Sequence, residues 1–240
     1  MMKVDDILKE FVNDCINGLD LIGIIQIGSS NYLKRPDDID LVFFSKDSVL
    51  RKESIKKLIL VIKKFEDKYN EIAFNFSGAD RKRDGKYNIT IVFLGESEFK
   101  VKYNPHDLFF FKNLTGDKNI RILYGLNPLT KLKIKLTNQH LLEMLSVDLK
   151  HALRRSLDDD QYRLEAFYHL FKTFLRAMLI NDGVFRKDEL VSAFAKKYSG
   201  SIKLPKESGR VLNHTLKKED FDEILEFCEG CLNYLATKSQ

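Results

Sequence analysis

Cysteine is scarce in this chain of 240 residues, and long apolar runs are absent. Three cysteines, Cys15, Cys228 and Cys231, are too few for a disulfide framework, so we expect a reducing, cytoplasmic environment. No stretch approaches the roughly 20 apolar residues that a bilayer-spanning helix needs. Residues 1–6 do not have the composition of a signal peptide. We therefore expect a protein that works in the cytoplasm and not in a membrane.

Charge of one sign is not in strong excess either. The chain has 40 basic against 35 acidic residues, a net charge of +5, and such a small surplus gives no support for nucleic-acid binding. A hydrophobic content of 44% with 31% charged residues is typical of a globular protein. This length is enough for one large domain or two smaller ones, each with its own core.

Apolar patterns predict alternating helices and strands in the first half of the chain. Residues 3–18 and 54–69 have apolar positions at helical spacing, and Pro105 follows a capping Asn104 at the start of another helix. Short apolar runs predict strands over 21–27, 39–45, 72–76, 87–94 and 121–124. We expect the cationic segment 80–86 to be a solvated hairpin loop between two of these strands; a contact to phosphate or nucleic acid is the alternative.

The second half has a different character. From Leu136 onward no strand is predicted, and helical stripes run through 140–157, 162–180, 188–198 and 221–235. Pro128 and the polar residues up to Thr137 form a plausible linker. We therefore predict an α+β protein, in which residues 1–130 form a mixed β-sheet covered by helices and residues 131–240 form an all-α helical bundle.

Two carboxylates and a glycine turn are the most informative residues. Asp38 and Asp40 alternate at the entrance to a strand, so their side chains share one face. Two such carboxylates repel each other, and a divalent cation relieves that repulsion. Mg²⁺ prefers oxygen ligands and keeps positions open for phosphates. The preceding turn, Gly28-Ser29, is suited to cradling a phosphate, which favours phosphoryl or nucleotidyl transfer.

Gly28-Ser29, a short spacer and the run Asp38-Ile39-Asp40-Leu41 resemble the signature of the polymerase-β-type nucleotidyltransferase superfamily, especially its minimal members. The resemblance implies a nucleotidyltransferase-like fold and a turn that holds the triphosphate of an NTP such as ATP. It also implies that Asp38 and Asp40 are catalytic and coordinate Mg²⁺, or Mn²⁺ in its place. A carboxy-terminal helical domain, common in this superfamily, would bind a hydroxyl acceptor: a small molecule, a protein side chain or an RNA end.

Three further residues belong to the predicted nucleotide site. Ser30 extends the turn, and Lys34 and Arg35 lie between the turn and the carboxylates, where they would meet triphosphate charge. The sequence does not identify the NTP, the acceptor or the oligomeric state, and a homodimer is compatible with it.

A third carboxylate usually completes the site from a neighbouring strand, and here it is missing. Asn88 and Thr90 stand where it is expected, and neither is a good general base near neutral pH. Asp84 and Glu96 flank the strand and are the alternatives. The absence supports a second hypothesis, a catalytically weakened nucleotide-binding or antitoxin-like interaction module.

The helical half contains one more pattern that resembles a known family. Arg163 and His169, six residues apart, are similar to the ribonuclease motif of the HEPN superfamily. Both residue types are frequent on helices, so a histidine at the edge of the core beside a solvated arginine is the simpler interpretation.

Cys228 and Cys231 have no second ligand pair that would indicate zinc, and we expect them to pack in the core.

Overall fold

The computed structural model describes residues 4–32, 38–46, 52–76, 86–98, 104–116, 119–157, 160–213 and 215–239. Its contacts divide the chain into two compact units. Unit 1 comprises Met1–Lys102 and Lys118–Leu132, and unit 2 comprises Tyr103–Asp117 and Lys133–Gln240. The predicted division into 1–130 and 131–240 differs from these units mainly at the helix that begins at Pro105, because that helix belongs to unit 2.

Unit 1 is built on one five-stranded sheet with the strand order β3-β4-β2-β1-β5. The central strand β2 pairs in parallel with β4 and in antiparallel with β1, so the sheet is mixed, as predicted. The strands are β1 Leu21–Ile27, β2 Asp38–Ser45, β3 Ile72–Phe76, β4 Tyr87–Gly95 and β5 Arg121–Gly125.

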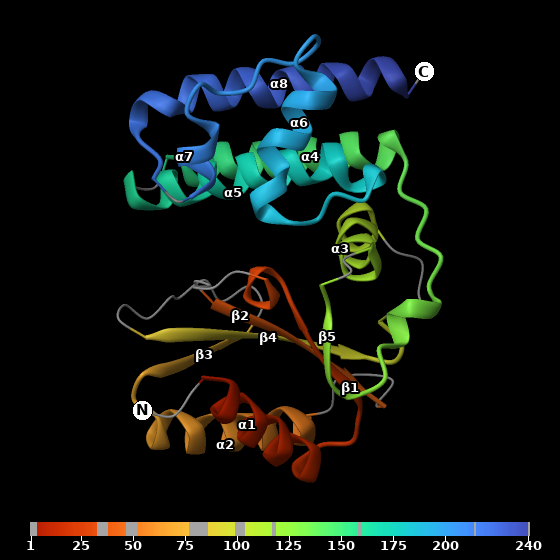
Figure 1. The fold of residues 1–240 in the computed structure, drawn as a ribbon, viewed down its shortest axis with the longest axis vertical. Coiled ribbons are helices and arrows are strands. Elements are labelled where there is room, and N and C mark those ends of the chain that lie inside the picture. The colour runs from red at the N-terminus through yellow and green to blue at the C-terminus, as the bar shows by residue number, and fades with distance from the viewer. Residues whose placement is uncertain are drawn as a thin grey trace. The chain divides into compact units, whose positions relative to one another are not determined.

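Two amphipathic helices, α1 (Val4–Gly18) and α2 (Lys52–Lys68), cover one face of this sheet (Figure 1). Aromatic rings fill the layer between them and the strands. The ring of Phe11 on α1 lies 4.5 Å from that of Phe74 and 5.3 Å from that of Phe65, measured between centroids. Because such rings bury large apolar areas, this cluster holds the two helices on the sheet. The other face of the sheet is not covered by α1 or α2.

The connection between β3 and β4 is not a hairpin, which corrects the prediction made from the sequence. The two strands are neighbours, but they run parallel, with Asn75 opposite Thr90 and Ala73 opposite Asn88. A two-stranded hairpin joins antiparallel strands, so β3 and β4 do not form one. The cationic segment 80–85 lies outside the described residues.

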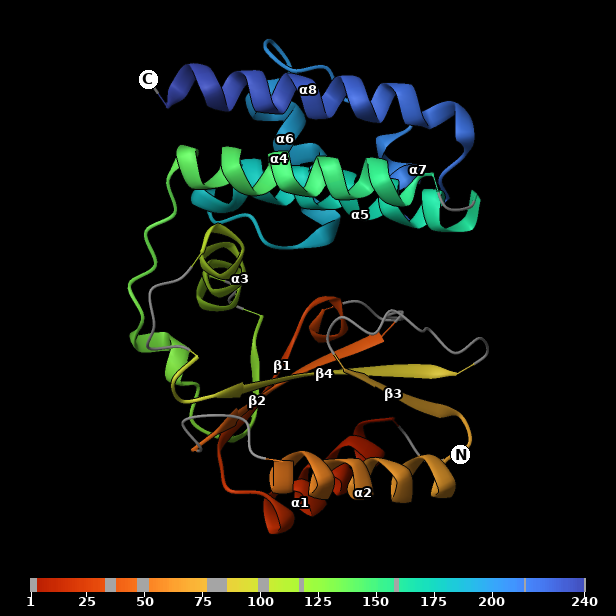
Figure 2. The ribbon, with the colours of Figure 1, turned by 180° about the vertical axis from the view of Figure 1, so that it is seen from behind.

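In unit 2 the described residues form helices joined by loops and no strand, as predicted. In Figure 2 the long helices α4, α5 and α8 run side by side. The ring of Phe227 on α8 is fully buried at 5.2 Å from the rings of Phe171 and Phe194, measured between centroids. Within the described ranges, no helix combines the length and apolar character that crossing a bilayer requires. The helices are α3 Pro105–Gly116, α4 Asn138–Arg155, α5 Asp160–Leu179, α6 Leu190–Tyr198, α7 Ser208–Leu212 and α8 Phe221–Lys238.

Candidate functional site

The two predicted carboxylates lie at the start of β2, in the middle of the sheet. The strand begins at Asp38, and Ile39 between the two acids is buried at 4% exposure, whereas Asp38 and Asp40 are each half-buried. The alternation places Ile39 in the core under α1 and α2 and the carboxylates on the opposite side of the strand. The predicted placement of both acids on one face at a strand entrance is therefore confirmed.

Gly28 brings the preceding turn directly against one of these carboxylates. It follows β1 with a φ of +80°, in the left-handed region that favours glycine. A Cβ atom built on Gly28 would lie 2.8 Å from Oδ2 of Asp40. The neighbouring residue Ile27 pairs with Asp40 across the antiparallel β1–β2 ladder, which explains this approach. The turn backbone and the Asp40 carboxylate are therefore part of one site.

The turn itself is a short 3-10 helix, Ser29–Asn31, held by side chains. Oγ of Ser30 donates to the carbonyl of Ile27 at 3.3 Å and accepts a bond from Nε2 of Gln26 at 3.0 Å. The Ser30 hydroxyl thus forms its hydrogen bonds within the turn. Its place in the nucleotide site stays a prediction. The structure describes no side chain for Ser29.

Lys34 and Arg35, the predicted cationic contacts to the triphosphate, lie outside the described residues, because the structure describes 4–32 and resumes at Asp38. Their role stays a prediction.

The strand beside the acids carries neutral residues at the expected position of a third carboxylate. Asn88 pairs with Asp38, and Thr90 pairs with Asp40, in the parallel β2–β4 ladder. Asn88 is 6% exposed; its Oδ1 accepts from Nδ2 of Asn75 at 3.1 Å, and its Nδ2 donates to the carbonyl of Lys86 at 3.1 Å. The oxygen of this carboxamide joins β4 to β3, and its nitrogen bonds the residue just before β4. Thr90 is left as the neutral side chain beside Asp40.

Of the two alternative carboxylates, Glu96 lies at the opposite end of the sheet. Glu96 follows the last residue of β4, and Gly95 pairs with Ser45 at the far end of β2. At about 3.3 Å per residue, the backbone of Glu96 lies on the order of 20 Å from that of Thr90. Asp84 lies outside the described residues. The described part of the chain has no group of three or more His, Cys, Asp or Glu side chains that could hold a metal ion.

Two carboxylates are nonetheless enough to bind Mg²⁺ when a substrate supplies further ligands. Mg²⁺ is often bound through only one or two carboxylates, with substrate phosphates and water as its other ligands. Asp38 and Asp40 are half-buried and adjacent to a turn that can approach a phosphate through its backbone. The donor set fits a Mg²⁺ ion that binds together with a phosphorylated substrate.

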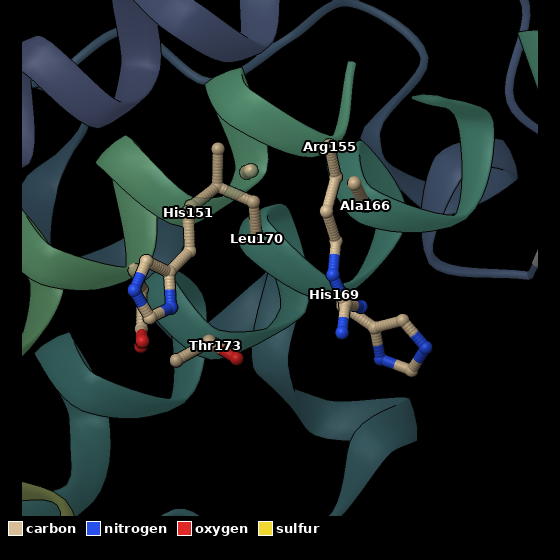
Figure 3. A pocket seen from close by; sticks show the side chains of 8 residues that line it. His151, Arg155, Ala166, His169, Leu170 and Thr173 are labelled. Atoms are coloured by element: carbon tan, nitrogen blue, oxygen red, sulfur yellow. The ribbon is translucent and has the colours of Figure 1, made fainter. Parts of the chain in front are cut away.

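Unit 2 contains a pocket of its own, of about 260 Å³, between α4 and α5 (Figure 3). Its apolar lining consists of Ala152, Ala166 and Leu170, which are 3–6% exposed. Oδ1 of Asp148 lies 2.9 Å from Nε2 of His106 on α3, which ties that helix to α4. The polar lining residues are Asp148, His151, Arg155, His169 and Thr173. The pocket offers hydrogen-bond donors and acceptors above an apolar floor.

A solved structure is similar to this chain at low sequence identity. It is the crystal structure of the spectinomycin adenyltransferase AAD(9) from Enterococcus faecialis with ATP and spectinomycin. The TM-score is 0.49 and the identity 18%, over 95% of this chain and 98% of that one. No protein-family model and no curated protein sequence matches the chain. So distant a likeness carries no argument about function, which must come from the residues of this chain.

Arg163 and His169, the pair that resembles a ribonuclease motif, both lie on α5 and have different partners. Nε of Arg163 donates to the carbonyl of Ser156 at 2.8 Å, and so bonds the chain just past the end of α4. Nε2 of His169 lies 3.6 Å from Oε1 of Glu165, an i,i+4 pair on the exposed side of the helix. Six residues correspond to about 240° around a helix, so the two side chains leave α5 in different directions.

The sequence prediction missed Gln26 and Asn31, which hold the turn. Nδ2 of Asn31 donates to the carbonyl oxygen of Gln26 at 2.9 Å, so the end of the turn is bonded back to β1. One signal was present in the sequence: Gln26 is the one polar side chain in the run Leu21–Ile27. A polar residue inside a buried strand requires hydrogen-bond partners, and the following turn supplies them.

Proposed function

We propose that this protein is a Mg²⁺-dependent nucleotidyltransferase that moves a nucleoside monophosphate from an NTP to a hydroxyl acceptor. The observation that carries the proposal is the close approach of Gly28 to Oδ2 of Asp40, with Asp38 on the same face of β2. A glycine turn suited to phosphate and a pair of carboxylates suited to a cation are thereby combined in one place. This combination meets the two requirements of triphosphate chemistry, which are positioning and charge neutralisation.

Each part of the site has a stated role in this proposal. The backbone at Gly28 and Ser29 positions the β- and γ-phosphates, and Lys34 and Arg35 add positive charge beside them. Asp38 and Asp40 hold the metal. Mg²⁺, when bound, neutralises the triphosphate and lowers the pKa of the acceptor hydroxyl. The acceptor oxygen forms a bond to the α-phosphorus, its proton passes to a base, and pyrophosphate leaves with the electrons of the broken P–O bond.

The acceptor, in this proposal, binds to unit 2. The pocket between α4 and α5 has a carboxylate in Asp148, imidazoles in His151 and His169, and a hydroxyl in Thr173. Such a mixed lining suits a polar small molecule with several hydroxyl groups, because it can both donate and accept hydrogen bonds. A protein side chain and an RNA end are the other acceptors of the same chemistry.

The second candidate function is a nucleotide-binding or interaction module that has lost turnover. One observation favours it: the positions beside Asp38 and Asp40 on β4 are Asn88 and Thr90, and neither side chain is a carboxylate. Such a protein would bind an NTP or a protein partner and release no pyrophosphate.

The decisive experiment is the thermal unfolding of the protein with each of the four NTPs, with and without Mg²⁺. A ligand at about 100 times its dissociation constant adds ~2.7 kcal/mol to the stability, which a melting curve resolves. We expect stabilisation by at least one NTP that depends on Mg²⁺ and is abolished in the double variant Asp38→Asn/Asp40→Asn. Equal stabilisation of wild type and variant would refute the assigned site.

Pyrophosphate release separates the two candidate functions. With the stabilising NTP identified, a panel of hydroxylated small molecules, proteins and RNA ends is supplied as acceptors. Pyrophosphate release that requires an acceptor, and that is lost when Asp38 and Asp40 are replaced, supports the transferase. Mg²⁺-dependent binding of the NTP without release for any acceptor supports the module that has lost turnover.

A further inference from the structure

One polar side chain interrupts the apolar strand β1. Gln26 lies between Ile25 and Ile27, two residues before Gly28, and it is only 4% exposed. Removing a carboxamide from water costs free energy unless hydrogen bonds replace those it made with the solvent. Its neighbours across the sheet are Leu41 on β2 and Arg121 on β5. Its amide is instead directed to the turn that follows its own strand.

The hydrogen bonds of Gln26 fix both ends of the turn. Its side-chain Nε2 donates to Oγ of Ser30 at 3.0 Å, and the same oxygen donates to the carbonyl of Ile27 at 3.3 Å. Its main-chain oxygen accepts from Nδ2 of Asn31 at 2.9 Å. The backbone between these contacts includes Gly28, whose φ of +80° sets it against Asp40. Hydrogen bonds between residues on either side of Gly28 therefore fix its conformation.

Stability alone does not account for an amide at this position. Oε1 of Gln26 and Oδ1 of Asn31 are both buried, and neither has a hydrogen-bond partner in the described part of the chain. A half-satisfied amide is less favourable in a strand than an apolar side chain of the same shape. The amide instead stabilises one particular conformation of the turn, because it bonds the strand to Ser30 in that turn.

We propose that Gln26 is a positioning residue for the nucleotide site: acting through Ser30, it holds the turn in the conformation that sets Gly28 against Asp40 and presents the backbone of residues 28–29 to the phosphates. The role assigned to the phosphates rests on the proposed function. The link from Gln26 to the turn rests on the hydrogen bonds alone.

The first test compares the wild type with Gln26→Met, which keeps the length of the side chain and removes both polar atoms. The dissociation constants of the four NTPs are measured by calorimetry in MgCl₂, beside the melting temperature of the ligand-free protein. We expect about tenfold weaker binding, the effect typical of residues that orient a ligand-binding group, with an unchanged or higher melting temperature. A merely structural role would give the reverse: a lower melting temperature and unchanged affinity.

Two further variants make the test specific. Ser30→Ala removes the same link from its other end, so we expect a similar loss of affinity and no additional loss in the double variant. Asn127→Ala is the matched control, because Asn127 is another buried amide of unit 1, but it caps the 3-10 helix Pro128–Lys131. It should lower the melting temperature and leave NTP affinity unchanged. Additive effects of Gln26→Met and Ser30→Ala would overturn the link through Ser30.

Amide hydrogen exchange separates failure of this inference from failure of the proposed function. In Gln26→Met we expect exchange at residues 28–31 to accelerate at least tenfold, whereas the β3 residues Ile72–Phe76 keep their rates. If the wild type binds no NTP, the proposed function fails, and the exchange rates alone decide whether Gln26 positions the turn. Unchanged exchange at residues 28–31 would overturn the inference, whatever the nucleotide result.

Discussion

Gly28 and Asp40 are in contact across the β1–β2 ladder, so closely that a single methyl group at residue 28 would lie 2.8 Å from the Asp40 carboxylate. The contact has two physical requirements: a left-handed backbone at residue 28, with a φ of +80°, and the absence of a side chain there. Glycine is the residue that meets both without strain. The geometry of the carboxylate therefore depends on the identity of residue 28.

The first prediction concerns Gly28→Ala. The new methyl group must move the Asp40 carboxylate or shift the turn, and the left-handed conformation costs about 1–2 kcal/mol for a residue with a Cβ atom. We expect a lower melting temperature and the loss of Mg²⁺-dependent stabilisation by NTP, both measured by thermal unfolding. Gly209→Ala is the matched control: Gly209 is exposed on α7, and a Cβ there meets nothing within 4 Å. That variant should retain full nucleotide stabilisation.

The second prediction concerns Glu10, which joins α1 to α2. Its carboxylate accepts bonds from Lys68 Nζ at 2.5 Å and from the Tyr69 hydroxyl at 2.6 Å. The bond from Lys68, followed by that from Tyr69, lowers the pKa of Glu10 from its ordinary value of 4.5. A lowered folded-state pKa means that the stabilisation is present above pH 4.5 and is lost as the pH falls through the folded pKa.

Glu10→Gln should therefore melt below the wild type at pH 7, and the difference should shrink as the pH falls through the lowered pKa of Glu10 and vanish once the carboxyl is protonated in both states. The effect should be small, because the pair is partly exposed to solvent. Melting curves across this pH range measure it. Glu229→Gln, at an exposed position on α8, controls for the change in net charge and should show no such convergence. A difference that persists in acid would contradict the assigned cause.

The third prediction concerns the three thiols. Cys15, Cys228 and Cys231 are all 0% exposed, and burial raises the pKa of each. Because the thiolate is the reactive form, a buried neutral thiol should be inert. We expect negligible reaction of the native protein with a disulfide reagent and the release of three thiols in guanidinium chloride. Ser199→Cys, at an exposed position, should add one rapidly reacting thiol and verify the assay. Rapid oxidation of Cys228 and Cys231 would contradict their role in packing.

Local patterns predicted most of the helices and strands. They did not predict how elements far apart in the sequence pair and pack. The apolar run 21–27 and the stripe of 3–18 correspond closely to β1 and α1, because burial alone dictates their periodicity. The direction of β4 beside β3 depends on how the chain crosses the sheet, which no local pattern records. Likewise, α3 belongs to unit 2 through packing with distant helices, although it is surrounded in sequence by unit 1.

For the site, too, the sequence predicted the local spacing of residues but not the contacts between separate elements. The spacing of Asp38 and Asp40 established that they share a face, since side chains alternate along any strand. The contact of Gly28 with Asp40 depends on the register Ile27 to Asp40 between β1 and β2, which only the folded sheet defines. The engagement of Ser30 by Gln26 was not predicted, because a serine in a small-residue turn has the same sequence signature whether it binds a ligand or its own strand.

The last prediction concerns Thr90, which lies beside Asp40 in the parallel β2–β4 ladder and is half-buried. Thr90→Asp places a third carboxylate on the same face as Asp38 and Asp40. Without a cation, the added charge repels its neighbours, and we expect a loss of about 1 kcal/mol of stability in EDTA. With Mg²⁺ the third carboxylate becomes a ligand, so the variant should gain more stability from the ion than the wild type does.

Thr90→Asn is the control, because it has nearly the same shape as the aspartate and adds no charge. Melting temperatures of the wild type and both variants, in EDTA and in increasing MgCl₂, give the comparison directly. A larger Mg²⁺-dependent rise for Thr90→Asp than for Thr90→Asn supports a cation site at the entrance to β2. Equal rises for the two variants would mean that a carboxylate at residue 90 does not reach a bound ion, which would contradict a cation site beside Thr90.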